Sequence, residues 1–121
     1  MNDLVSAELA DDPTVDITTT GRRSAQPRRI EIWVMDIGGR YFITGTPGRR
    51  DWLANLRADP TLTVHLKRVA GVDIVATAIE VTDPDLRREV FTHLVADWYR
   101  TQESVDDLVA TAPMVEVLLP G

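Results

Sequence analysis

The stretch that decides the fold is residues 15–35, VDITTTGRRSAQPRRIEIWVM. Its two ends are rich in β-branched residues, and its middle holds a glycine, a serine and a proline. β-Branched runs favour strands, and glycine and proline between two such runs favour a turn. We therefore expect a β-hairpin with strands over 15–20 and 29–35 and a turn over 21–27.

Further strands are expected on the C-terminal side of this hairpin. A tight turn at 36–39 precedes a strand over 40–44, so we expect the first three strands to form a meander. Apolar and polar residues alternate over 61–67, which predicts a half-buried strand. The run 72–81 is apolar on both faces and predicts a strand that is covered on both sides. The last expected strand covers 114–119.

Helical spacing of apolar residues predicts helices before and between these strands. They cover 2–10, 49–58, 84–100 and 104–110. Asp83 is a favoured N-cap residue, and a proline follows it at the first helical position. In the longest helix, the residues expected to form the buried stripe are Leu86, Val90, Leu94 and Trp98.

Strands outnumber helices and follow one another in hairpins, which predicts an α+β fold. The expected architecture is a small antiparallel β-barrel of about six strands with helices packed outside it. At 121 residues the chain is large enough for one such domain. We divide it into an N-terminal helix or arm over 1–14 and a barrel domain over 15–121.

Composition excludes several classes of protein. The formal net charge of −6 disfavours non-specific binding of nucleic acid. No apolar run approaches the roughly 20 residues that span a bilayer, and the first residues lack a secretory signal. With no cysteine there is no disulfide framework, so we expect a cytoplasmic protein with no nucleic-acid partner and no integral membrane segment.

Motifs for metal and nucleotide chemistry are missing from the sequence. His65 and His93 are 28 residues apart and fit no HxxxH or HExxH pattern, so no metal site is expected. The sequence contains no GxGxxG, GxxxxGK[ST] or GxSxG motif, and its acidic residues form no defensible catalytic pair. We therefore expect no side chain to act as a nucleophile.

Basic residues are concentrated in one part of this acidic chain. Ten of the thirteen lysines and arginines lie between Arg22 and Arg68, and the densest groups are 22–29 and 49–50. Clustered guanidinium groups bind phosphate and carboxylate oxygens bidentately, so the pattern predicts a small anionic ligand. The alternative is that these are ordinary surface charges in a chain with twelve arginines and one lysine.

Aromatic residues offer a second contact for a planar ligand. In an extended strand, Arg29, Glu31 and Trp33 share one face, which suits the wall of a ligand site. A planar heterocycle stacks well on aromatic side chains, although Trp52 and Trp98 are equally suited to an ordinary place in the core. The aromatic residues available for stacking are Trp33, Tyr41, Phe42, Trp52, Trp98 and Tyr99.

The hairpin sequence resembles a known family. Residues 18–28, TTTGRRSAQPR, are similar to the opening motif of the deazaflavin (F420)-dependent nitroreductase family. Residues 51–60, DWLANLRADP, resemble that family's tryptophan–asparagine–leucine segment, and 113–117 resembles its closing strand. The resemblance extends over 15–119. It implies a split β-barrel of the kind shared with pyridoxamine-phosphate-oxidase-like proteins.

The resemblance implies that F420, a deazaflavin with a phosphodiester and a glutamate tail, binds in a groove. By motif position, the phosphate and the tail carboxylates are expected on Arg22, Arg23, Ser24 and Arg28. The deazaflavin side is expected to be lined by Arg29, Ile30, Glu31, Ile32, Trp33, Thr44, Gly45, Thr46, Trp52, Leu53 and Asn55.

The sequence departs from the family pattern at three places. Ala25 replaces the usual turn glycine, so a different turn type is expected in the hairpin. The loop 47–50 is shorter than the family's basic loop. The family's substrate-pocket tyrosine has no clear match; Tyr99 is the nearest candidate for that position and for a catalytic proton donor, and Thr101 is the alternative occupant.

Together these features predict an F420H2-dependent reductase that transfers a hydride to an electron-poor conjugated substrate, namely a quinone, an enone or a nitroaromatic. Two alternatives stay open: an FMN-binding split-barrel oxidoreductase, and a non-catalytic protein that binds or carries F420. The expected partners are the small-molecule substrate and a second copy of the chain in a homodimer, which would cover the apolar strand 72–81.

Overall fold

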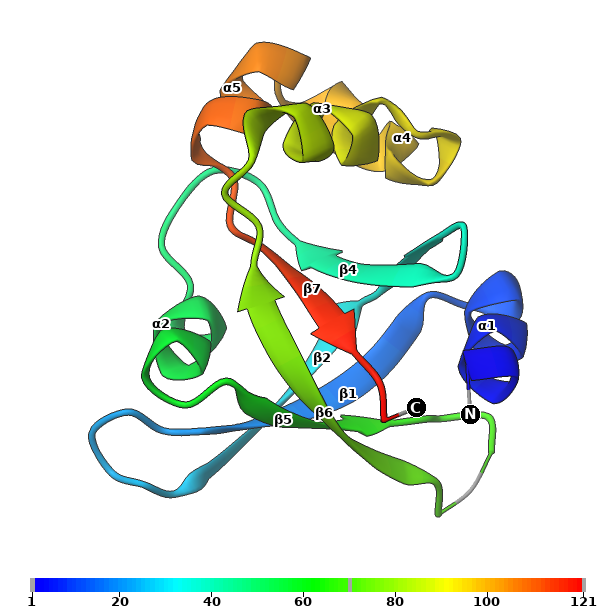
Figure 1. Ribbon diagram of the computed structural model, residues 1–121, viewed down its shortest axis with the longest axis vertical. Helices are drawn as coiled ribbons and strands as arrows, with labels where there is room; N and C mark the ends of the chain where they lie inside the picture. The colour runs from blue at the N-terminus through cyan, green and yellow to red at the C-terminus, as the bar shows by residue number, and fades with distance from the viewer. Residues whose placement is uncertain (1, 70, 121) are drawn as a thin grey trace.

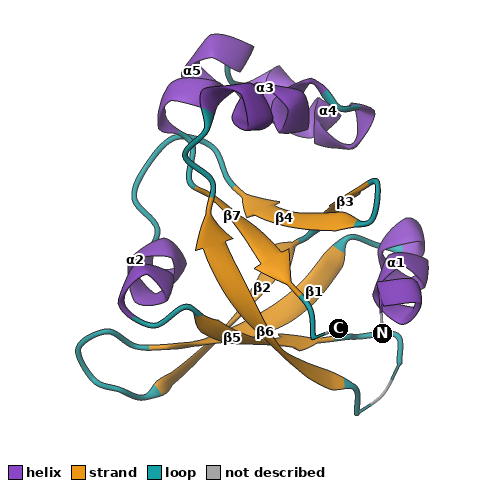
Figure 2. Ribbon diagram, in the orientation of Figure 1, coloured by secondary structure: helices purple, strands orange, loops and turns teal. Residues whose placement is uncertain are grey.

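The computed structural model describes residues 2–69 and 71–120 (Figure 1). Within them, seven strands form one antiparallel sheet in the order β2-β1-β5-β6-β7-β4-β3. The strands are β1 (Thr14–Thr20), β2 (Pro27–Trp33), β3 (Met35–Ile37), β4 (Arg40–Thr44), β5 (Thr61–His65), β6 (Asp73–Glu80) and β7 (Met114–Leu118). The helices are α1 (Asn2–Asp11), α2 (Asp51–Ala58), α3 (Pro84–Thr92), the 3₁₀ helix η1 (Leu94–Ala96), α4 (Asp97–Gln102) and α5 (Val105–Thr111). Figure 2 shows the sheet curled into a barrel, with α1 and α2 on opposite sides and α3–α5 in a separate layer.

The first hairpin forms as the sequence predicts. Every second residue of β1 is buried, which is the alternation of a strand with one face on a core. β1 pairs with β2 from Thr14↔Trp33 to Thr20↔Pro27. The second strand therefore begins two residues before the predicted start at Arg29 and ends earlier than predicted.

The predicted three-strand meander is wrong. β2 is the first strand of the sheet and β3 and β4 are its last two, although only Val34 separates β2 from β3 along the chain. The chain therefore crosses from one edge of the curled sheet to the other at Val34, whose N–H donates to the Pro13 carbonyl at 2.9 Å. β2 and β4 lie close to each other across an open seam but are not neighbours in the ladder of the described strands.

This seam makes the architecture a split barrel. The predicted α+β fold, a small antiparallel split β-barrel with flanking helices, is confirmed. The described part of the chain has seven strands, one more than the expected number of about six. The additional strand arises because Val34 divides the predicted second strand into two.

The barrel interior holds the larger core. Inward-facing side chains of the strands pack there against Trp52 and Leu56 of α2 and against Val5 and Leu9 of α1. Each fully buried aliphatic or aromatic side chain of this kind stabilises a fold by about 1.5–3 kcal/mol. Trp52, at 7% exposure, is therefore a core residue, the second of the two interpretations that its sequence position allowed.

α1 is docked on the barrel by a buried carboxylate. Glu8 is 4% exposed and accepts the backbone N–H of Lys67 at 3.0 Å and of Arg68 at 2.9 Å. Tyr41 Oη donates to the carbonyl of Asn2 at 2.9 Å. These bonds satisfy polar groups that the apolar contacts of α1 would otherwise leave buried without partners.

A second core lies between the sheet and the layer of α3, α4 and α5. Phe42 and Met114 of the sheet contribute to it, with Phe91, Tyr99 and Leu108 from the helices.

Arg87 of α3 ties this layer together, since its guanidinium bonds to backbone carbonyls of several elements. The bonds are Nη1 to Val81 O at 2.9 Å, Nη2 to Leu108 O at 3.2 Å, Nε to Val109 O at 2.7 Å and Nη2 to Ala112 O at 2.5 Å.

The predicted helix over 84–100 is interrupted. α3 ends before His93, whose backbone is extended with φ −69° and ψ 148°. His93 Nδ1 accepts the N–H of Val95 at 3.1 Å, so the imidazole caps the start of η1. Leu94 is 76% exposed and Trp98 is 47% exposed, so these two residues are not in the predicted buried stripe.

The prediction that residues 72–81 are covered on both faces is wrong within this chain. Every second residue of β6 is buried, but Val75 is 62% exposed and Ile79 is 52% exposed. Two of the outward residues of β6, Val75 and Ile79, are apolar, and they gave this strand an apolar pattern on both faces. With Leu118, which is 41% exposed on the neighbouring strand, they form an apolar stripe on the outside of the sheet.

Candidate functional site

The basic hairpin turn is held to α2 by a buried asparagine. Asn55 Oδ1 accepts the backbone N–H of Arg22 at 3.1 Å and its Nη1 at 3.0 Å. The amide nitrogen of Asn55 donates to Thr19 Oγ1 at 3.2 Å. Arg22 Nη2 also lies 3.5 Å from Asp51 Oδ1. Asn55, which the family resemblance placed beside the ring, thus fixes the hairpin and orients Arg22.

The hairpin turn keeps a glycine-type backbone. The N–H of Gly21 donates to the carbonyl of Gln26 at 2.8 Å, and the N–H of Ala25 donates to the carbonyl of Gly21 at 2.9 Å. Ala25 has φ +59°, in the left-handed region that glycine adopts most easily. The alanine at this position therefore strains the turn, but the residue still adopts the left-handed conformation.

The loop between β4 and α2 is folded around Arg50. Its Nη2 donates to the Thr46 carbonyl at 2.9 Å and lies 3.2 Å from Thr46 Oγ1, while Nη1 donates to the Arg49 carbonyl at 3.1 Å. Gly45 and Gly48 make room for the guanidinium, because a Cβ at either would come within 3.0 or 3.1 Å of its nitrogens. This packing brings Arg49 and Arg50 to the start of α2.

A groove of about 940 Å³ runs along α2, and one end of it is strongly basic. Arg22 and Arg23 of the hairpin and Arg49 and Arg50 of the loop line that end. In the described chain no side chain caps the N-terminus of α2 at Arg50, so the first N–H groups of the helix stay available. Backbone N–H donors and the helix dipole attract anions, and the arginines add formal charge. We call this region the basic end of the groove.

A second cavity, of about 360 Å³, opens in the seam of the barrel. Trp33 forms its aromatic wall together with Trp98 and Tyr99 of α4. The Trp33 ring centroid lies 5.3 Å from that of Trp98 and 6.2 Å from that of Tyr99, with nearly perpendicular planes. The remaining lining residues are Glu31, Ile32, Gly45, Thr46 and Arg50. An aromatic wall opposite loop backbone suits a planar heterocycle.

Tyr99 is the phenol of the seam cavity. Burial raises its pKa above the ordinary tyrosine value, and the nearby charge of Arg50 only partly opposes this. The Tyr99 hydroxyl has no hydrogen-bond partner among the described residues. Every fully buried side-chain nitrogen or oxygen of these residues does have a partner. The Tyr99 hydroxyl must therefore reach the accessible surface, and the cavity it lines is the seam cavity.

Arg50 joins the two spaces, because it lines both the seam cavity and the basic end of the groove. A ligand with a planar head and an anionic tail can therefore place its head in the seam and its tail on the arginines.

A third cavity, of about 400 Å³, lies between the hairpin and the adjacent side of α2. Its lining includes Ser24, Arg28 and Ile30, and it meets the large groove at Arg22 and Arg23. The residues predicted to bind the phosphate and the tail therefore lie in different places. Arg22 and Arg23 line both the large groove and the third cavity, whereas Ser24 and Arg28 line only the third cavity.

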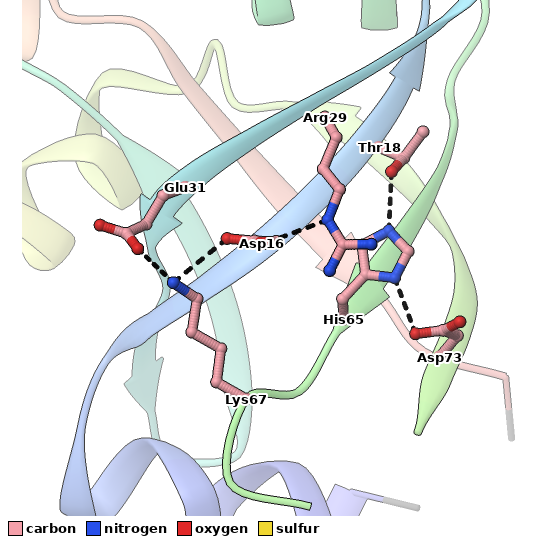
Figure 3. A network of polar contacts seen from close by, with 7 residues as sticks. All are labelled: Asp16, Thr18, Arg29, Glu31, His65, Lys67 and Asp73. Atoms are coloured by element: carbon pink, nitrogen blue, oxygen red, sulfur yellow. Dashed lines mark hydrogen bonds and ion pairs between the residues drawn. The ribbon is translucent and has the colours of Figure 1, made fainter. Parts of the chain in front are cut away.

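Arg29 and Glu31 lie in a polar network on the outer face of the sheet (Figure 3). Arg29 Nε donates to Asp16 Oδ2 at 3.0 Å, and Lys67 Nζ pairs with Asp16 Oδ1 at 3.3 Å and with Glu31. Burial raises the pKa of Asp16, but the bonds from Arg29 and Lys67 outweigh it and hold that pKa below its usual value. Arg29 is thus engaged on the sheet and does not line a described cavity.

His65 belongs to the same face. Its Nε2 lies 2.7 Å from Thr18 Oγ1 and its Nδ1 lies 2.7 Å from Asp73 Oδ1 (Figure 3). Both ring nitrogens are therefore engaged by neighbouring strands, and His65 is buried, with 9% exposure.

The structure brings together some of the predicted ring-side residues. Those that line the seam cavity are Glu31, Ile32, Trp33, Gly45 and Thr46, and the predicted proton donor Tyr99 lines it with them. Thr44 is buried and donates to the Pro113 carbonyl at 2.5 Å, and Leu53 lines the large groove. The residues assigned from the family resemblance do not include Arg49 and Arg50, although the charge pattern of the sequence had marked this pair as part of an anion site.

The comparison with protein families identifies the chain. A family model described as F420H(2)-dependent quinone reductase matches residues 2–116. The chain belongs to this family. It is therefore an F420-dependent oxidoreductase with F420 as its coenzyme, and the family resemblance of the hairpin motif is confirmed.

Solved structures show the same fold at low sequence identity. A protein of the pyridoxinephosphate oxidase family from Clostridium acetobutylicum has a TM-score of 0.70 at 12% identity, over 98% of this chain and 82% of its own. An F420-H2 dependent reductase has a TM-score of 0.57 at 23% identity, over 88% of this chain and 94% of its own. A structure described as a domain-swapped dimer has a TM-score of 0.59 at 20% identity, over 95% of this chain and 97% of its own.

Among residues 2–69 and 71–120, no helix is both long enough and apolar enough to cross a bilayer.

Proposed function

We propose that this family member transfers a hydride from F420H2 to a quinone, with the deazaflavin in the seam cavity and the phosphodiester at the basic end of the groove. The observation that carries the proposal is the connection of these two spaces at Arg50. A planar redox coenzyme with an anionic tail matches an aromatic cavity that continues into a cluster of arginines.

The arginines at the basic end would hold the coenzyme from outside the reacting ring. Arg23, Arg49 and Arg50 surround the uncapped start of α2, while Arg22 is already oriented by Asn55. Charge-assisted hydrogen bonds to phosphate are about twice as strong as neutral ones. Binding energy gained at the tail would therefore position the ring.

In the seam cavity the bound coenzyme supplies the hydride. The protein's part is to orient the ring against Trp33 and to limit access of water. Tyr99 presents a hydroxyl into the cavity and keeps its proton across the neutral range, because burial raises its pKa. Its position in the cavity is the reason that we assign it the donation of a proton to the reduced substrate, although the raised pKa makes the phenol a weaker acid.

Oxidation of F420H2 in the presence of menadione tests the proposed reaction, with a nitroaromatic and an enone in parallel. We expect the quinone to be reduced fastest. The recovery of the absorbance of oxidised deazaflavin measures the rate with each substrate. Binding of F420 without turnover of any substrate would instead support a carrier protein. Binding of FMN as tightly as F420 would support a flavin enzyme.

The matched variants for this assay are Arg23→Ala and Arg88→Ala. Loss of Arg23 should weaken F420 binding by about 1.5–3 kcal/mol if one charge-assisted contact is lost. Arg88 is exposed, pairs with Asp106 at 2.8 Å and lines none of the three cavities, so its loss should leave affinity unchanged. Equal affinity of wild type and the Arg23 variant would reject the placement of the tail.

We also propose that the protein forms a homodimer. The exposed apolar stripe of Val75, Ile79 and Leu118 is a surface that a second copy would cover, and one similar structure is described as a domain-swapped dimer. Sedimentation velocity over a range of protein concentrations tests this proposal, and a monomer at every concentration would reject it.

A further inference from the structure

The rim of the seam cavity carries a carboxylate. Among the described residues that line this cavity, the charged ones are Glu31 and Arg50. The Glu31 side chain is 65% exposed, whereas Tyr99 is 5% exposed. Glu31 therefore lies where the cavity opens to solvent, and Tyr99 lies deeper in it. Arg50 marks the side of the cavity that continues into the basic end of the groove.

The stability of the sheet does not account for a glutamate at this position. In the register of β1 and β2, Glu31 stands directly opposite a second carboxylate, Asp16. Like charges directly opposite each other on neighbouring strands are destabilising. An uncharged side chain at position 31 would avoid this repulsion and would still fit an exposed strand position.

Lys67 holds the carboxylate at the rim (Figure 3). Its Nζ pairs with Glu31 and lies 3.3 Å from Asp16 Oδ1, so one ammonium bridges the two acids. The bond from Glu31 raises the pKa of Lys67 above its ordinary value, although desolvation opposes this, and the ammonium stays charged at neutral pH. Lys67 lines none of the three cavities, so the carboxylate is the member of this pair that faces the seam.

We propose that Glu31 selects the electron acceptor by charge: it favours uncharged acceptors and disfavours those with an anionic group beside the reducible ring. The inference rests on the proposed function, which places the coenzyme ring in the seam cavity. An acceptor has to pass the rim to reach that ring, and a fixed carboxylate there repels a sulfonate or carboxylate group. Lys67 is a positioning residue that partly neutralises the repelling charge.

Two variants that break the same ion pair should shift the selectivity in opposite directions. Glu31→Gln removes the repelling charge and leaves Lys67 paired with Asp16, so an anionic acceptor should gain relative to an uncharged one. Lys67→Met removes the compensating charge, so the anionic acceptor should lose. Interactions between exposed charges are weak in water, and we expect each shift to be about twofold to fivefold.

The assay compares menadione with a naphthoquinone that carries a sulfonate group, each reduced by F420H2. The two quinones differ in intrinsic reactivity, so the ratio of their kcat/KM values in each variant is compared with the wild-type ratio. Both shifts should become smaller as salt is added, because salt screens exposed charges. A change in the shape of the cavity would not depend on salt in this way.

Binding without turnover gives a second measurement. Calorimetric titration of each quinone into protein loaded with oxidised F420 should show the same two opposite shifts in relative affinity. Glu31→Asp keeps the charge on a shorter side chain and should keep a ratio close to that of the wild type. A ratio in Glu31→Asp equal to that in Glu31→Gln would reject a role for the charge.

A second ion pair on the sheet provides matched controls. Arg40 Nε and Nη2 donate to the two carboxylate oxygens of Glu116, both at 2.9 Å, and neither residue lines any of the three cavities. Glu116→Gln changes the net charge from −6 to −5, as Glu31→Gln does, and Arg40→Met changes it to −7, as Lys67→Met does. Both controls should keep the wild-type ratio. Thermal unfolding of all the variants checks that each is folded.

The outcomes separate this inference from the proposed function. If the wild type reduces neither quinone, the proposed function fails and the inference fails with it. If both quinones are reduced but Glu31→Gln and Lys67→Met leave the ratio unchanged, or shift it in the same direction, the proposed function stands and the role of Glu31 is rejected. Equal shifts in the matched controls would also reject it, because total charge would then explain the selectivity.

Discussion

Ala25 shows how one side chain can carry a measurable strain. It sits in the hairpin turn with φ +59°, a conformation that costs an L-residue about 1–2 kcal/mol relative to its right-handed form. Glycine has no Cβ and adopts this conformation freely. Relief of the strain is partly offset by the greater entropy of glycine in the unfolded chain.

Ala25→Gly should therefore raise the free energy of unfolding by about 0.5–1 kcal/mol. The shift of the denaturation midpoint measures this gain, provided that the dependence of the unfolding free energy on denaturant concentration is unchanged. Ala7→Gly is the control: Ala7 is exposed within α1, where glycine should destabilise by about 0.5–1 kcal/mol. If Ala25→Gly destabilises as Ala7→Gly does, the turn is not strained.

Tyr99 is the second residue whose environment makes a testable difference. Burial disfavours the charged phenolate, so the folded pKa is raised above the unfolded value of about 10. Below pH 10 the phenol is neutral in both states, and its effect on stability does not vary. As pH rises past 10, the unfolded state loses its proton first, so unfolding becomes more favourable.

Phenolate absorbance during an alkaline titration measures this difference between wild type and Tyr99→Phe. The subtracted curve should show ionisation above pH 10, and alkaline loss of stability should be smaller in the variant. Quinone reduction should show no step from Tyr99 at neutral pH. A subtracted ionisation below pH 10 would contradict the described burial of this phenol.

At the scale of elements, Arg87 connects the helical layer to the sheet. Four backbone carbonyls, at the end of β6 and around the end of α5, accept bonds from one guanidinium. Lysine cannot reproduce this fork, since its ammonium is a compact point charge. The packing of α3 and α5 against the sheet therefore depends more on this one side chain than on helix propensity.

Arg87→Met should lower the free energy of unfolding by about 3 kcal/mol, because several buried carbonyls lose their donor. The neighbouring Arg88→Met provides the control: Arg88 is exposed and pairs only with Asp106 among the described residues, so its loss should cost less than about 1 kcal/mol. Chemical denaturation of both variants measures the difference. Similar losses in the two would reject the role given to Arg87.

At the scale of the whole molecule, local features of the fold could be predicted and long-range ones could not. The β1–β2 hairpin follows from adjacent residues, and the Asp83 cap starts α3 as expected. The partner of β4 is β7, some seventy residues further along the chain, and no local pattern indicates that pairing. The break at His93 depends on an imidazole cap that helical periodicity does not reveal.

The candidate site also combines features that the sequence could predict with features that it could not. The resemblance of the hairpin motif to a known family predicted the coenzyme, whereas the assignment of the hairpin arginines to its tail stays a prediction. The role of Asn55 as an anchor depends on the approach of α2 to the hairpin. The seam cavity depends on the crossing at Val34 and on α4 lying over the seam, which are properties of the whole split barrel.

The charge distribution of the whole molecule leads to the last prediction. The net charge is −6, so the protein as a whole repels an anionic coenzyme, while the arginines at the basic end attract it locally. Added salt screens both effects, over about 10 Å at 0.1 M ionic strength. In the proposed placement the coenzyme lies within that distance of the arginines, so F420 affinity should fall as salt rises. Arg23→Ala and Arg88→Ala both change the net charge from −6 to −7, yet only Arg23 lines the groove. The slope of log Kd against log salt should therefore become shallower in Arg23→Ala and stay at the wild-type value in Arg88→Ala. Equal slopes in the two variants would mean that total charge, and not the basic end of the groove, controls binding.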